Sequence, residues 1–142
     1  MSKKKLFLLI TVIIALLTVT IIVCYNKNVS YTKFNNISDN GGDIKFLYPY
    51  GDGYIEDQAN KEILINFINS IEVVEKNVKF PNESADVYIK IYDKRTLTND
   101  VRFYGENMIY DHLANRRYVA NREIRSELIE LLKLIDGDKT GQ

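Results

Sequence analysis

The chain has 142 residues, with 19 lysines and arginines against 19 aspartates and glutamates, so its formal net charge is zero. It contains one cysteine, one histidine and no tryptophan. This composition argues against a nucleic-acid binder that relies on bulk positive charge, a disulfide-stapled scaffold and a Cys/His zinc site. The length allows one domain with a short appendage.

An N-terminal hydrophobic segment is the strongest signal in the sequence. Three lysines at positions 3–5 precede a run of 19 uncharged residues from Leu6 to Cys24. As a helix this run would be about 28 Å long, close to the roughly 30 Å hydrocarbon core of a bilayer. We therefore expect residues 1–24 to form an uncleaved signal anchor that crosses the membrane through residues 6–24. The lysines predict a cytoplasmic N-terminus and a C-terminal domain outside the cell.

Two other fates of this segment stay open. A cleaved signal peptide would make the protein secreted, but such peptides usually have an apolar centre of about 7 to 15 residues and a small-residue cleavage site, and neither is clear here. Lipidation of Cys24 would make it a bacterial lipoprotein. That pattern requires Gly, Ala or Ser directly before the cysteine, and Val23 stands there.

Residues 25–42 predict a flexible linker, because they are rich in Asn, Ser and Thr and end at Gly41 and Gly42. Within it, residues 29–34 give a weak signal for a short strand. Beyond the lysine-rich start the chain carries 16 positive and 19 negative residues, a net charge of −3. This mild acidity gives no reason to expect nucleic acid as a partner. No cysteine follows Cys24, so a packed core rather than disulfides must stabilise the exported part.

An extracytoplasmic domain is predicted at residues 43–136, followed by a C-terminal tail at 137–142. It opens with a strand at 43–48, which Pro49 and a turn at residues 51–53 bring to an end.

The next predicted element is an amphipathic helix. Asp57 is a suitable N-cap, and Lys61 falls on the face expected to be solvated. Residues 73–80 predict a further strand. The expected buried face of the helix consists of apolar residues spaced one, three or four positions apart: Ala59, Ile63, Leu64, Phe67, Ile68 and Ile71.

An antiparallel meander follows. Residues 86–93 alternate between apolar and polar, which is the period of a strand with one buried face. A polar loop at 94–99 leads to a second alternating strand at 100–104. Shorter strands are expected at 108–111 and 116–120.

The last predicted element is a helix with Asn121 as its N-cap, an apolar stripe from Ile124 to Ile135 and Gly137 after its end. The fold class is therefore α+β. We expect an N-terminal transmembrane helix and then a small antiparallel sheet of five to six strands, with two amphipathic helices on one face.

Several segments of residues 43–135 share one pattern with a known group of proteins. They are the early helix KEILINFINSI, the strand pair YIKIYDK and VRFYGEN with its Tyr-Gly turn, and RRYVANREI leading into LIELLKLI. With the lysine-rich hydrophobic start, this order resembles small exported or membrane-anchored domains of unknown function from Gram-positive bacteria. The resemblance brings no catalytic residues with it.

Catalytic motifs are lacking in the sequence. His112 is the only histidine and no G-x-S-x-G motif occurs. The Gly-rich turns do not match phosphate-binding loops, and the acidic residues at 52–57 lack the spacing of a calcium loop. We expect no catalytic residue, metal or cofactor, and hence no enzyme. A cell-envelope enzyme with a dispersed carboxylate site, or an inhibitor or immunity-type protein, remains the alternative.

A Tyr- and Arg-rich surface is the remaining candidate site. All six arginines lie after position 94, and tyrosines recur through the meander. Tyr and Arg dominate binding hot spots, although tyrosines also favour strands and arginines favour solubility. We expect a non-enzymatic module that docks an envelope protein or a cell-wall partner. The candidate binding residues are Tyr88, Tyr92, Arg102, Tyr104, Arg116 and Tyr118.

Overall fold

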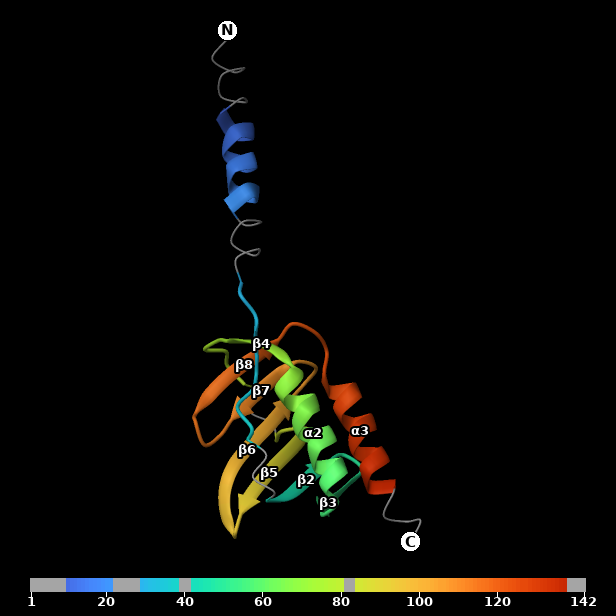
Figure 1. Cartoon of the computed structure of the whole chain (residues 1–142). Coiled ribbons are helices and arrows are strands. Elements are labelled where there is room, and N and C mark those ends of the chain that lie inside the picture. The colour runs from blue at the N-terminus through green and yellow to red at the C-terminus, as the bar shows by residue number, and fades with distance from the viewer. Residues whose placement is uncertain (1–9, 22–28, 39–41, 81–83, 138–142) are drawn as a thin grey trace. The chain divides into compact units, whose positions relative to one another are not determined.

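The chain divides into two compact units, Met1–Ser30 and Tyr31–Gln142. The computed structural model describes residues 10–21, 29–38, 42–80 and 84–137 (Figure 1). Each unit is described by itself below.

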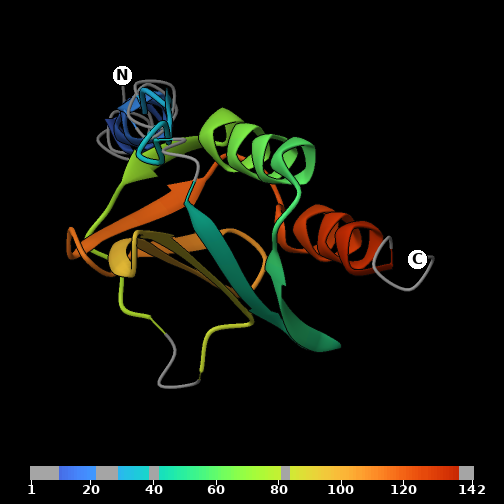
Figure 2. The same ribbon diagram turned by 60° about the horizontal axis from the view of Figure 1, so that its bottom comes forward.

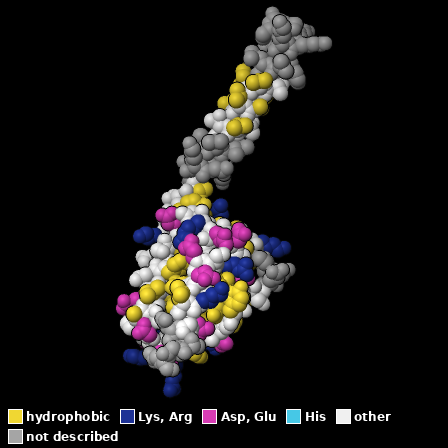
Figure 3. All heavy atoms as spheres, turned by 90° about the vertical axis from the view of Figure 1, so that its right-hand side faces the viewer, with side chains coloured by type: hydrophobic (Ala, Val, Ile, Leu, Met, Phe, Trp, Pro, Cys, Tyr) yellow, Lys and Arg dark blue, Asp and Glu magenta, His cyan; other side chains and the backbone are white. Residues whose placement is uncertain are grey.

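In the first unit, residues 10–21 form a helix whose side chains are all exposed, and Figure 3 shows apolar side chains along it. Among the described residues, no helix combines the length and the apolar character needed to cross a membrane. The predicted span extends past this helix into residues 6–9 and 22–24, including Cys24, which lie outside the described residues. The transmembrane assignment stays a prediction.

The second unit is built on one antiparallel sheet. Its order is β1-β4-β8-β7-β6-β5-β2-β3. The predicted α+β class is confirmed, but the prediction of five to six strands is wrong, because the described residues form eight. They are β1 (Thr32–Lys33), β2 (Asp43–Tyr48), β3 (Gly51–Ile55), β4 (Glu72–Glu75), β5 (Val87–Asp93), β6 (Thr96–Tyr104), β7 (Met108–Asp111) and β8 (Arg116–Ala120).

The two strands outside the predicted set are the edge strands β1 and β3, of which β1 falls within the weak strand signal at residues 29–34. Residues 51–53 were expected to be a turn, but the turn is at residues 49–50, and Gly51 already pairs with Tyr48. β1 lies in the segment predicted as a linker and pairs with β4 through only two residues. Phe34 and Ile37, which follow β1, are buried in the core. The folded unit therefore starts before the predicted boundary at residue 43.

The helices α2 (Gln58–Ser70) and α3 (Arg125–Gly137) cover one face of the sheet (Figure 2). As predicted, Asp57 caps α2, since its Oδ2 accepts a hydrogen bond from the Asn60 amide at 2.8 Å. The predicted orientation of α2 is partly wrong: Lys61 is only 6% exposed, whereas Ile63 is 50% exposed. The residues that α2 buries, at positions 61, 64, 65 and 68, follow the helical period.

The start of α3 also differs from the prediction. Asn121 is not its N-cap, because the helix begins at Arg125. Instead, the Asn121 amide donates a hydrogen bond to the Glu72 carbonyl at 3.0 Å, and its side chain donates to the Glu72 carboxylate. Asn121 therefore fastens the end of β8 to β4.

The hairpin between β5 and β6 turns through Lys94 and Arg95, because Asp93 pairs directly with Thr96. Both turn residues have positive φ, 45° and 77°. Two-residue turns of this kind usually contain Asn-Gly, since glycine adopts positive φ without strain. Because neither residue is a turn former, the sequence pointed to a longer loop at 94–99.

Candidate functional site

The face of the sheet opposite the helices carries the candidate site. On β5 the residues at 87, 89 and 91 are buried beneath the helices, whereas those at 88, 90 and 92 are half-buried on the other side. Strand register places one residue from each of five adjacent strands in a single row: Leu47, Tyr88, Arg102, Tyr110 and Arg117. We call the surface formed by this row and by its neighbours Lys45, Lys90, Tyr92 and Tyr104 the open face.

Arg102 is held in place at the centre of the open face. Its Nε and Nη2 donate to the two carboxylate oxygens of Asp100 at 3.0 and 2.9 Å. Asp100 is only 2% exposed, and its hydrogen bond raises the pKa of Arg102 above the usual value. The Arg102 guanidinium carbon also lies 5.5 Å from the centre of the Tyr88 ring. The arginine therefore has a fixed position, and a buried carboxylate offsets its charge.

One end of the open face is covered by the segment that follows β4. The Phe80 ring lies 4.8 Å from the Tyr104 ring and 5.5 Å from the Tyr110 ring, centre to centre. Arg117 places its guanidinium carbon 5.4 Å from the Phe80 ring centre and donates to the Val78 carbonyl at 3.1 Å. This covering leaves the β2 and β5 end as the accessible part of the open face.

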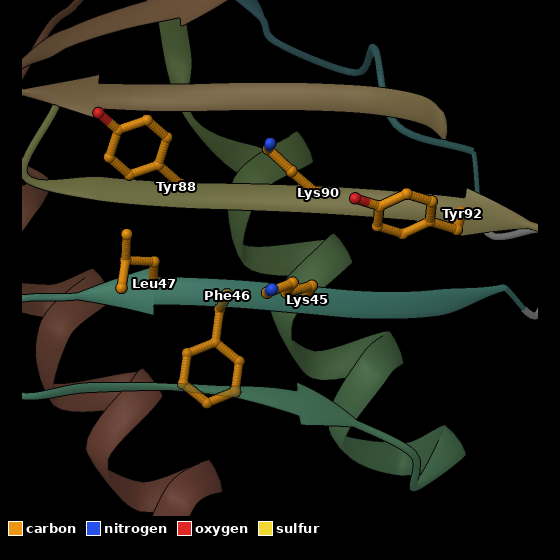
Figure 4. Close-up of a pocket in the computed structure, with 6 residues that line it drawn as sticks. All are labelled: Lys45, Phe46, Leu47, Tyr88, Lys90 and Tyr92. Atoms are coloured by element: carbon orange, nitrogen blue, oxygen red, sulfur yellow. The ribbon is translucent and has the colours of Figure 1, made fainter. Parts of the chain in front are cut away.

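A shallow hollow of about 240 Å³ lies at that accessible end. Lys90 stands between Tyr88 and Tyr92 along β5, and Lys45 and Leu47 come from the adjacent β2 (Figure 4). Lys45 and Lys90 are direct cross-strand partners. The lining is made of Lys45, Phe46, Leu47, Tyr88, Lys90 and Tyr92.

The two lysines of the hollow form no ion pair within the described part of the chain. Lys45 Nζ lies 5.4 Å from the centre of the Tyr54 ring. Lys90 has Asp100 as its partner on β6, but both oxygens of that carboxylate bind Arg102. Like charges directly opposite each other destabilise a sheet, so this pair costs stability unless an anion lies between the two ammonium groups.

Four of the six predicted binding residues, at positions 88, 92, 102 and 104, share the open face. The other two do not join them. Tyr118 faces the helices, is 6% exposed and packs edge-on against Phe34 at 5.2 Å. Arg116 is exposed on the same side of β8 as Tyr118, and their hydrogen bond raises the pKa of Arg116. The arginine of β8 that reaches the open face is Arg117.

Sequence reasoning missed Lys45, Lys90, Tyr110 and Arg117. Lys90 had a local signal, because it alternates with Tyr88 and Tyr92 on a predicted strand. The pairing of Lys90 with Lys45 had none, since it depends on β2 and β5 being neighbours.

The buried carboxylates have structural partners. Asp111 accepts a hydrogen bond from the Ala114 amide at 3.1 Å, which closes the turn after β7, and Asp100 binds Arg102. His112 is exposed, with its ring centre 5.5 Å from that of Tyr110. No group of three or more metal-binding side chains occurs among the residues that the structure describes. The expectation that the chain is not an enzyme stays a prediction.

Comparison with known proteins gave no match to a family model, to a curated protein or to a solved structure. The resemblance to small exported Gram-positive domains therefore also stays a prediction.

Proposed function

We propose that the chain is a membrane-anchored extracytoplasmic binding module whose accessible open face contacts an envelope partner. One observation carries this proposal: the helices cover one face of the sheet, while Tyr88, Lys90 and Tyr92 stay partly exposed on the other.

The N-terminal helix supports the anchoring part. Its apolar side chains are exposed, and its two C-terminal threonines satisfy their hydroxyl groups internally. Thr18 donates to the Ile14 carbonyl at 2.7 Å, and Thr20 donates to the Leu16 carbonyl at 2.8 Å. Such bonds suit a helix in hydrocarbon, where water cannot accept them. The exposed apolar residues are Ile10, Val12, Ile13, Ile14, Leu16, Leu17, Val19 and Ile21.

Preorganised side chains support the binding part. Asp100 fixes Arg102, and the Tyr88 hydroxyl accepts a hydrogen bond from the Ala85 amide at 3.1 Å. Because these side chains are already ordered, contact with a partner costs less conformational entropy. Tyr and Arg also supply large contact areas with a polar end.

Expression of the full chain in bacteria tests the topology. We expect the protein in the membrane fraction, and protease added to intact protoplasts should digest the domain. The mass of the purified protein distinguishes the three fates of the N-terminal segment. A mass that includes residues 1–24 identifies the anchor, and a shorter mass identifies cleavage. Added lipid on Cys24 identifies a lipoprotein. Recovery in the soluble cytosolic fraction, or a domain that survives protease while a known external domain is cut, would contradict the proposal.

Cross-linking in intact cells tests the binding face. Tyr88→Ala combined with Tyr92→Ala should abolish cross-linked species that the unmodified chain forms. The matched control combines Ile63→Ala with Leu134→Ala, since both residues are exposed on the helices. Arg102 is kept in both variants, because its loss would leave Asp100 without its partner. The same cross-linked species from both variants would exclude this face.

A further inference from the structure

We propose that the hollow between β2 and β5 binds the phosphate group of a small organic phosphomonoester. Lys45 and Lys90 hold the phosphate, and Tyr88 and Tyr92 contact the organic group attached to it. This inference rests on the proposed function, because it names a ligand class for the same open face.

The charge of the lysine pair is the first argument. Lys45 and Lys90 are directly opposite in register, where side chains start about 4.5 to 5.5 Å apart at Cβ. Their flexible stems allow both ammonium groups to reach one anion. A phosphomonoester carries a charge of about −1.5 to −2 at neutral pH, which matches the two positive charges. A bound phosphate therefore converts a repulsive pair into an attractive site.

The choice of phosphate over carboxylate follows from the same residues. A carboxylate carries one charge and would leave one of the lysines unneutralised. Planar recognition of carboxylates is typical of arginine, and Arg102 already uses its Nε–Nη2 edge to bind Asp100.

The carboxylates of the open face leave the lysine pair available. Asp100 is opposite Lys90 in register, but Arg102 neutralises it. Asp52 is opposite Leu47, and Asp43 is opposite Tyr92. Neither of these two is the direct partner of a lysine, so the positive pair occupies the centre of the hollow.

The size and lining of the hollow suggest what the phosphate is attached to. Its volume of about 240 Å³ is below the roughly 300 to 1,000 Å³ of pockets for drug-sized ligands, so it suits a ligand as small as a monosaccharide phosphate. Tyr88 and Tyr92 flank Lys90 (Figure 4), and Leu47 adds exposed apolar surface. A sugar ring can pack on such surfaces while the phosphate binds both lysines.

Titration of the full chain with glucose 1-phosphate tests the inference. The protein is kept in micelles of a neutral polyoxyethylene detergent, and amide chemical shifts are followed by NMR. We expect saturable shifts concentrated at residues 45–47 and 88–92. Lys45→Gln and Lys90→Gln should each weaken binding at least tenfold. Lys94→Gln, in the exposed β5–β6 turn, is the matched control and should bind like the unmodified chain.

Further ligands separate the parts of the site. Inorganic phosphate should shift the same lysine region but bind more weakly, and glucose should cause no saturable shift. The inference is overturned if glucose 1-phosphate does not saturate, if both lysine variants bind it like the control, or if glucuronate binds as tightly. Cross-linking with the Tyr88 and Tyr92 variants is a separate test of the proposed function. If the phosphate site is refuted, the cross-linking result alone decides whether the proposed function holds.

Discussion

Arg102 and Asp100 form a bidentate ion pair on the side of the sheet away from the helices. Nε and Nη2 of the arginine lie 3.0 and 2.9 Å from the two carboxylate oxygens. The Asp100 side chain is 3% exposed and that of Arg102 is 23% exposed. The carboxylate therefore depends on the arginine as a charged partner.

Replacing Arg102 should destabilise the fold. In Arg102→Ala the buried Asp100 carboxylate loses its partner, and we expect a loss of about 2 to 4 kcal/mol in the free energy of unfolding, since removing one member of a buried pair costs roughly 3 to 5 kcal/mol and this pair is partly exposed. Urea unfolding measures the change. Glu130→Ala breaks the exposed pair with Lys133 and should cost only about 0 to 1 kcal/mol. Equal losses in the two variants would contradict this view.

Gly42 is required by the close approach of its backbone to β5. A Cβ at this position would lie 1.9 Å from the Tyr92 carbonyl oxygen, so the backbone of one segment must move. We expect Gly42→Ala to lose about 1 to 3 kcal/mol, as overpacked sites do. A Cβ added at Gly137 would meet no atom within 4 Å, so Gly137→Ala is the control. Thermal unfolding of both variants measures the effect. An unchanged unfolding midpoint for Gly42→Ala would refute the steric argument.

The β5–β6 turn is a site where the fold can be stabilised. Replacing Lys94 and Arg95 with Asn and Gly should raise the free energy of unfolding by about 1 kcal/mol, because non-glycine residues at positive φ are strained. The same dipeptide in place of Pro49 and Tyr50 is the control, since neither of these residues has a positive φ. The midpoint of urea unfolding should rise for the first variant only.

Tyr48 should make stability depend on alkaline pH. Burial raises its pKa above 10, and its hydrogen bond to Asp136 at 3.2 Å adds to the effect. The folded state thus disfavours tyrosinate, whereas the unfolded state ionises near pH 10, so the stabilisation is complete below pH 10 and is lost above it. Tyr48→Phe should unfold more easily at pH 8, by about 1 kcal/mol, and this deficit should shrink by pH 10.5. Tyr50→Phe, at an exposed position, serves as the control, and a deficit independent of pH would exclude ionisation as the cause.

Local chemistry made much of the fold predictable. Asp57 caps α2 because a carboxylate just before a helix accepts a hydrogen bond from a backbone amide of the first turn. Strand β5 was predictable because apolar and polar residues alternate along it. The edge strands were harder to predict for physical reasons. Gly51 and Gly53 are typical of a turn, and β1 is only two residues long, which is too short for a clear strand pattern.

The candidate site was less predictable than the fold, because it depends on which strands are neighbours. Tyr88, Tyr92, Arg102 and Tyr104 share a face through simple alternation on two consecutive strands. In β8, two arginines precede Tyr118, and the sequence did not indicate which of them faces the helices. The Lys45–Lys90 pair joins strands that are far apart in the chain, so no local sequence pattern predicts it.

The short strand β1 has a mechanical consequence for the proposed anchoring through the N-terminal segment. Any pull on the N-terminal segment reaches the folded unit through two paired residues of β1 and then through Phe34, whose amide donates to the Ile71 carbonyl at 2.8 Å. β1 should therefore detach first under load, and the buried Phe34 ring should resist further unfolding from this end. β2 is the next strand in the chain and carries Lys45 of the hollow, so the burial of Phe34 is what separates a pull on the N-terminal segment from the lysine pair.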